Sequence, residues 1–191
     1  MGVSLKKGGN VSLSEQVPGL KTVRVALGWK ERETEGEDFD LDASCFMLTA
    51  EGKVRNDADF VFYGQLKSSC GSVEHSGDNK IGGTDDAEVL SVRLDQVPSA
   101  VTKLLFTVTI HEYDTRRQNF GMVDSAYIRI VNDENSDEIV RFDLSEDAGT
   151  CTAMIFGEIY RHGGSWKFRA VGQGYNHGLA QLCQTYGVEV E

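Results

Sequence analysis

Short runs of β-branched and aromatic residues, broken by Gly, Asn and Asp, constrain the fold of this chain more than any other feature. Runs of this length and composition are typical of β-strands bounded by turns. Helical patterns are scarce, and we expect only one turn at 116–120 and a short helix at 179–186 near the C-terminal end. Strands are expected at 22–29, 40–48, 60–63, 88–94, 103–111, 126–131, 138–142, 153–161 and 165–171.

Many strands without long helices between them predict antiparallel pairing, and two packed sheets are the usual arrangement for a chain of 191 residues. We therefore predict an all-β fold, a two-sheet antiparallel β-sandwich with a short C-terminal helix. The run from His162 to Gly164 predicts a hairpin between the last two strands, because Gly tolerates positive φ. No repeat or linker divides the chain, so 1–191 is interpreted as one domain.

The charge balance favours cations as ligands. The chain has 30 acidic and 19 basic residues, a net charge of −11, so phosphate surfaces repel it. This disfavours nucleic acid and anionic membranes as general partners. The start, MGVSLKKGG, lacks a signal-peptide core, and no run approaches about 18 apolar residues. We expect a cytoplasmic protein with no membrane span.

The cysteines are consistent with a reducing compartment. Cys45, Cys70, Cys151 and Cys183 are widely separated, and no CxxC motif occurs. This spacing argues against zinc, thioredoxin-like and cluster-binding sites, and favours buried single thiols. A reducing cytosol is the simplest setting for them.

Three carboxylates alternate with apolar residues in the run Asp38-Phe39-Asp40-Leu41-Asp42. In an extended chain all three carboxylates lie on one side, and the apolar side chains face the core. Such carboxylates repel one another unless a hard cation lies among them, and calcium takes six to eight oxygen ligands. An EF-hand is excluded, because the positions that need Gly and Glu hold Ala43 and Thr49. Further ligands must therefore come from distant segments.

Three segments offer additional oxygen ligands: 76–79 with Asp78 and Asn79, 84–88 with Asp86 and Glu88, and 56–59. Turns also use Asp and Asn for local hydrogen bonds, so each segment has a purely structural interpretation. Because all the candidate ligands are oxygens, calcium is the leading metal and magnesium the second.

A polar cluster follows the most apolar strand and contains His111, Glu112, Arg116, Arg117, Gln118 and Asn119. It is interpreted either as an anion or small-ligand pocket or as a hydrogen-bonded strand end. The chain has no Gly-rich phosphate loop, GxSxG or HExxH motif, so we expect no catalytic residues and no enzyme. A metal-dependent phosphoesterase, or a nucleotide- or small-ligand-binding protein, is the alternative.

Several long strings resemble the TerD family of tellurium-resistance and stress-response proteins. They run from one end of the chain to the other: MGVSLKKGGNVSLS, GLKTVRVALGW, DFDLDASCFML, NDADFVFYG, SVEHSGDN, TVTIH, RQNFG, RFDLSEDA and FGEIYRHGGSWKFRAVGQGY. The resemblance implies a β-sandwich that binds two calcium ions. It also implies a role in tellurite and stress resistance, and association with other Ter proteins at the inner face of the membrane.

The resemblance also implies a set of calcium ligands. They are Asp40 and Asp42 in DFDLD, with Asp38 beside them, Asp78 and Asn79 in SGDN, and Asp86 and Glu88 in DDAE. The function expected from the residues and the resemblance together is that of a calcium-stabilised interaction module.

Overall fold

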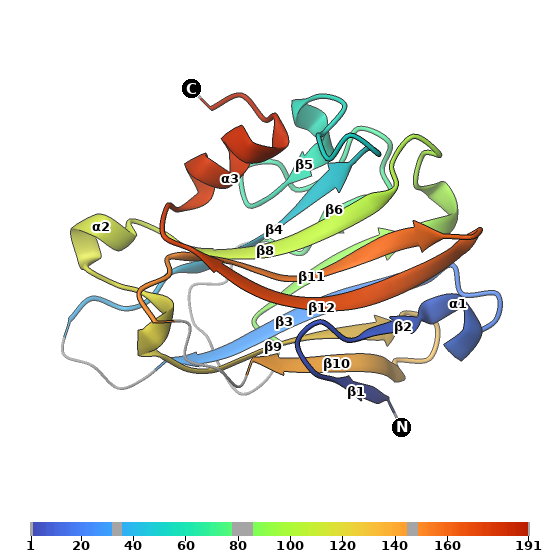
Figure 1. Ribbon diagram of the computed structural model, residues 1–191, viewed down its shortest axis with the longest axis horizontal. Coiled ribbons are helices and arrows are strands. Elements are labelled where there is room, and N and C mark those ends of the chain that lie inside the picture. Colours follow the sequence, from blue (N-terminus) through green and yellow to red (C-terminus); the bar gives the residue numbers. More distant parts are fainter. Residues whose placement is uncertain (1, 32–35, 78–85, 145–148, 191) are drawn as a thin grey trace.

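The computed structural model describes residues 2–31, 36–77, 86–144 and 149–190. Within these ranges the chain forms two six-stranded sheets that pack face to face (Figure 1). The predicted all-β sandwich is therefore confirmed. No helix in the same ranges is long and apolar enough to cross a membrane.

The sheets are named A and B, and neighbouring strands in each are hydrogen-bonded. Sheet A runs β1 (Val3–Leu5), β10 (Glu138–Leu144), β9 (Val123–Asn132), β3 (Thr22–Glu31), β7 (Glu88–Arg93) and β6 (Val73–His75). Sheet B runs β2 (Asn10–Ser12), β12 (Ser165–Tyr175), β11 (Ala153–His162), β8 (Lys103–Ile110), β4 (Leu41–Leu48) and β5 (Phe60–Val61). The named strands pair antiparallel except β1 with β10, which is parallel.

The main core lies between the two sheets. Alternate residues of β3 and β7, such as Val25 and Leu90, meet alternate residues of β8 and β11, such as Phe106 and Phe156. This is the expected result of side chains pointing to opposite faces along a strand. The apolar run at 103–111 forms β8, which lies in the interior of sheet B between β11 and β4.

A second, smaller core lies on the outer face of sheet B. There helix α3 (Leu179–Tyr186) packs Leu182 and Cys183 against Phe46 and Leu105 (Figure 1). Because β4 is covered on both faces, all eight of its residues are buried. This explains why the 40–48 run begins with alternation and then becomes continuously apolar.

The short elements depart from the expected boundaries. Two more helices, α1 (Leu13–Gln16) and α2 (Tyr113–Arg116), and three 3₁₀ turns, η1 (Asp57–Asp59), η2 (Leu94–Gln96) and η3 (Phe120–Met122), complete the described part of the chain. The expected turn at 116–120 is thus replaced by α2 and η3. The expected strand at 60–63 ends at Val61, because the main chains of Phe62 and Gln65 bond reciprocally in a turn. The predicted hairpin is confirmed, with Gly163 and Gly164 at φ of 55° and 78°.

Candidate metal centre

The alternation at 38–42 is present in the structure. Phe39 and Leu41 are buried in the main core, Asp38 is exposed, and Asp40 and Asp42 are only 4% and 6% exposed. Asp42 lies opposite Thr109 in the pairing of β4 with β8, and the main-chain oxygen of Asp40 accepts a bond from the His111 amide at 2.8 Å. Two carboxylates therefore enter a buried environment at the start of β4, where an uncompensated negative charge is unfavourable.

Glu88 reaches from sheet A to the edge of β4. Its Oε2 accepts a hydrogen bond from the Ala43 amide at 2.5 Å. Beside it, the Nδ1 atom of His75 accepts from the Gly77 amide at 2.9 Å, which leaves Nε2 to donate to the Ala43 oxygen at 3.1 Å. Glu88 and His75 thus satisfy both main-chain groups of Ala43, at a point where β5 no longer pairs with β4. We call this arrangement the Ala43 clasp.

Asp86 is held by an ion pair on the outer face of sheet A. Its carboxylate accepts two bonds from Arg129, at 2.9 and 2.6 Å, and one from the Tyr127 hydroxyl at 2.9 Å. Burial alone would raise the pKa of Asp86, but the bonds from Arg129 and Tyr127 outweigh it and hold that pKa below its ordinary value. Burial and the bond to Asp86 raise the pKa of Tyr127 to about 12.

Residues of the polar cluster after β8 form hydrogen bonds and an ion pair with the segment before Asp40. Arg116 pairs with Glu37 at 3.2 Å and donates to the main-chain oxygen of Asp38 at 3.2 Å. Gln118 is buried and donates to the Glu37 oxygen at 2.7 Å. These contacts agree with the interpretation of the cluster as a hydrogen-bonded strand end. They hold the acidic run at its N-terminal end, whereas the Ala43 clasp holds the residue that follows Asp42.

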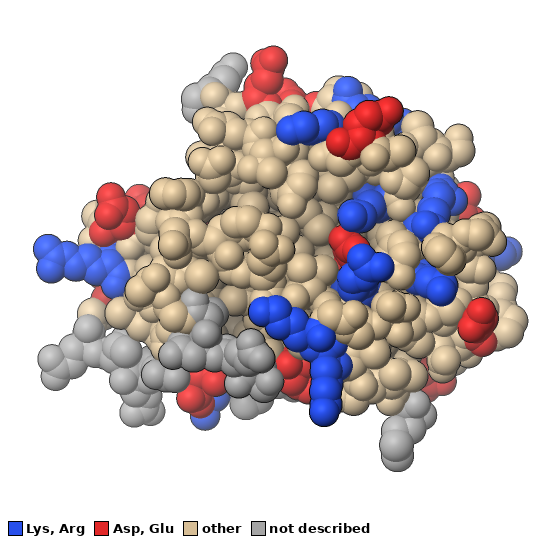
Figure 2. All heavy atoms as spheres, in the orientation of Figure 1, with Lys and Arg blue, Asp and Glu red and all other residues tan. Residues whose placement is uncertain are grey.

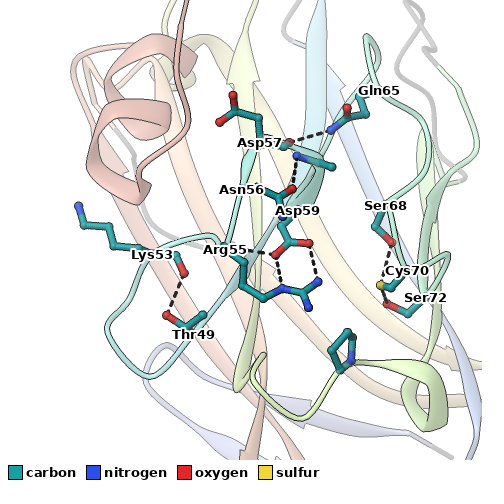
Figure 3. A network of polar contacts seen from close by, with 12 residues as sticks. Thr49, Lys53, Arg55, Asn56, Asp57, Asp59, Gln65, Ser68, Cys70 and Ser72 are labelled. Carbon is teal, nitrogen blue, oxygen red and sulfur yellow. Dashed lines mark hydrogen bonds and ion pairs between the residues drawn. The ribbon is translucent and has the colours of Figure 1, made fainter.

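The 56–59 segment has a structural role rather than a free set of ligands (Figure 3). Asn56 caps η1 by accepting a bond from the Ala58 amide at 3.0 Å. Asp59 is fully buried and forms a two-bond ion pair with Arg55, at 2.7 and 2.9 Å. Asn56 and Asp59 therefore make local hydrogen bonds, as expected for Asp and Asn in turns, whereas the Asp57 carboxylate accepts a bond from the distant Glu189 amide at 3.1 Å.

The predicted ligands fit a hard cation in part. All four described aspartate and glutamate candidates with buried or partly buried carboxylates offer the oxygens that calcium prefers, and Asp86 and Glu88 also accept bonds from protein donors. Within the described part of the chain, no three His, Cys, Asp or Glu side chains form a group that could hold a metal ion. The other two predicted ligands, Asp78 and Asn79, lie outside the described residues.

The fold and the site together define the class of this protein: a two-sheet β-sandwich with buried carboxylates at the start of one strand. The chain belongs to the TerD domain family, whose family model matches residues 1–186. It is 60% identical to Tellurium resistance protein TerD of Serratia marcescens, over 98% of each chain. It is 49% identical to General stress protein 16U of Bacillus subtilis (strain 168), over the whole of both chains.

A solved structure supports the fold. The homologue of telluride resistance protein (TerD) from Streptomyces coelicolor A3(2) superposes with a TM-score of 0.69 at 22% identity. The match covers 86% of this chain and 95% of that one. The names of these three relatives refer to resistance and stress, and state no enzymatic activity.

Proposed function

We propose that this chain is a calcium-stabilised interaction module that acts in tellurite resistance and the stress response. The resistance and stress role is supported by the names of its full-length relatives. The calcium role is supported chiefly by one observation: Asp40 and Asp42 are both buried, two positions apart, at the start of β4. A bound calcium ion would offset the repulsion between the two carboxylates.

The protein's own contacts prepare the acidic run for such a ligand. Arg116 and Gln118 hold the main chain at 37–38, and the Ala43 clasp holds β4 on the other side of Asp42. Because the chain is held on both sides of the acidic run, binding of an ion would cost little further conformational entropy. In this proposal Asp78 and Asn79 are the first candidates for completing the ligand set, and the module acts in the cytoplasm with other Ter proteins at the membrane face.

Complementation of a tellurite-sensitive strain that lacks this gene tests the proposal. We expect the natural chain to restore growth on tellurite, and the double variant Asp40→Asn, Asp42→Asn to fail while accumulating as folded protein. Asp143→Asn is the matched control, because Asp143 is exposed and pairs with Arg141 on β10, away from the acidic run. Full restoration by the double variant would show that the two buried carboxylates are dispensable.

A further inference from the structure

A groove beside α3 is a separate surface from the candidate metal centre. It has a volume of about 340 Å³, and its floor comes from α3, β5 and the residues that follow them. Its aromatic and aliphatic lining consists of Phe60, Phe62, Tyr63, Leu179, Ala180, Cys183, Val188 and Val190. Asp57, Gln65 and Glu189 are its polar lining residues. We call it the α3 groove.

Tyr63 and Val190 of this groove are exposed to solvent, whereas Phe60, Cys183 and Val188 are buried. Tyr63 and Val190 are 40% and 50% exposed, and together with Leu66 they are the exposed large hydrophobic residues of the described chain. Single exposed apolar residues are ordinary, but a cluster of them marks an interaction surface. On the face drawn in Figure 2, the area over α3 is also largely uncharged, and the helix has no charged residue.

Stacked aromatic rings make the wall of the groove rigid. Phe60 stacks on buried Phe46 and on Phe62, each at 4.5 Å between ring centroids, and Tyr63 meets Phe62 edge-on at 5.1 Å. The series therefore runs from the small core out to the exposed Tyr63 ring. Rigid aromatic side chains of this kind are the usual anchors of protein interfaces.

The charged residues that line the groove are all acidic. Asp57 and Glu189 line it, and no Lys or Arg is among its described lining residues. An adjoining pocket, which shares Tyr63 and Leu179, is lined by three acidic residues, Asp42, Glu112 and Asp114, and by no Lys or Arg among the described residues. Acidic rims beside an apolar floor complement a ligand that presents cations next to apolar side chains.

We propose that the α3 groove binds a segment of a partner protein in which an aromatic or aliphatic residue is flanked by Lys or Arg. The apolar side chain enters between Tyr63 and α3, and the basic residues meet Asp57 and Glu189. The proposal rests on the proposed function, because it specifies the surface through which the interaction module acts. The groove itself is lined by no residue of the predicted calcium ligand set, although Asp42 lines the adjoining pocket. Its test therefore needs neither calcium nor tellurite.

The probe is an acetylated, amidated peptide in which three arginines alternate with phenylalanine and leucine. It is titrated into ¹⁵N-labelled protein, with and without chelator, and amide shifts are followed by NMR. We expect shifts centred on Tyr63, Ala180 and 188–190, unchanged by chelator. The same peptide with glutamate in place of arginine should bind at least tenfold more weakly.

Two neighbouring substitutions provide the matched comparison. Ala180 lines the groove and Gln181 does not, both are exposed on α3, and Arg is a good helix former at either position. Ala180→Arg places a cation in the groove and should weaken binding at least tenfold, whereas Gln181→Arg should change it less than twofold. Tyr63→Ser is the second variant if Ala180→Arg unfolds, and it should also weaken binding.

Four results would overturn the proposal. Equal weakening by the two arginine variants, or shifts centred on 36–42, would indicate non-specific attraction to an acidic protein. Equal binding of the glutamate peptide would remove the charge argument. A dimer of the natural chain that Ala180→Arg dissociates in sedimentation would show that a second copy of the chain fills the groove instead.

Discussion

At the scale of single residues, Arg55 and Asp59 show how position decides the energetics of an ion pair (Figure 3). The Asp59 side chain is 0% exposed and the Arg55 side chain 29% exposed, so the two ends of the pair differ in their access to water. Loss of the arginine leaves a carboxylate buried without its cation. Loss of the aspartate leaves a guanidinium that can turn toward solvent.

We therefore expect Arg55→Met to lower the free energy of unfolding by about 3 kcal/mol, and Asp59→Asn by about half as much. Urea denaturation of both variants measures this difference. Lys67→Met is the control, because Lys67 and Glu74 are both about half exposed, and its loss should change stability by less than about 1 kcal/mol. An equal loss in the Arg55 and Asp59 variants would contradict the asymmetry.

At the scale of elements, the Ala43 clasp joins the two sheets where β4 has lost its partner strand. A side chain from β7 and another from β6 replace the missing main-chain partner. This gives Glu88 a structural role that exists without any metal, in addition to the ligand role implied by the family resemblance.

Stability measured in a chelator distinguishes the structural role of Glu88 from its predicted role as a calcium ligand. Glu88→Ala leaves the buried Ala43 amide without its acceptor, so we expect a loss of about 2 kcal/mol in the free energy of unfolding, in EDTA as in calcium. Glu88→Gln keeps an oxygen acceptor and should retain most of the stability in EDTA. If Glu88→Ala lost stability only when calcium was present, the clasp would have no role of its own.

Helix α3 is an element whose docking depends on neutral side chains. Burial raises the pKa of Cys183 to about 11, with the nearby Asp57 charge adding to the effect, and burial raises the pKa of Tyr186 to about 12. In the unfolded chain the thiol ionises from about pH 9 upward. The contribution of the neutral Cys183 thiol to the free energy of unfolding is therefore fully present below pH 9 and is lost as the pH rises toward 11.

Removal of the Cys183 thiol should reduce this alkaline loss. We expect the fall in unfolding free energy between pH 7.5 and 10.5 to be smaller in Cys183→Ala than in the natural chain, by about 1 kcal/mol. Urea denaturation under reductant measures the fall, and each protein is compared with itself so that the cavity left by the substitution cancels. An identical fall in both proteins would show that another group controls the alkaline response.

The elements also show what a sequence can and cannot predict. Long apolar runs such as 103–111 and the 179–186 pattern identified β8 and α3, because strand and helix periods are local properties. The three-residue strands β1, β2 and β6 were missed, because they are too short to show a period. The position of α2 was also missed. The helix is capped at its two ends by Glu112 and Arg117, whose positive φ values of 50° and 53° are uncommon for these residue types.

The candidate site was predictable to a similar degree. The alternation around Asp40 and Asp42 is visible in the sequence, and the burial of Phe39 and Leu41 follows from it. The Ala43 clasp and the bond between Asp86 and Arg129 join residues more than 30 positions apart. Such contacts depend on the packing of the two sheets, and no spacing rule in the sequence indicates them.

At the scale of the whole molecule, charge is unevenly distributed over an acidic protein. Lys103 and Arg169 lie on the outer face of sheet B, where both pair with the nearly buried Glu158 at 3.2 and 3.3 Å. The acidic run at 36–42 and the α3 groove carry the opposite sign. In a chain of net charge −11, we expect cations to bind most strongly where carboxylates are both close together and buried.

Calcium titration calorimetry on chelator-stripped protein is the decisive measurement for the proposed metal centre. We expect saturable binding of calcium, two ions per chain as the family resemblance implies, and a loss of at least one of those binding events in the double variant Asp40→Asn, Asp42→Asn. The Asp143→Asn control should bind like the natural chain. No binding heat in the natural chain at millimolar calcium, or an unchanged isotherm in the double variant, would contradict the claim that these two carboxylates hold the metal.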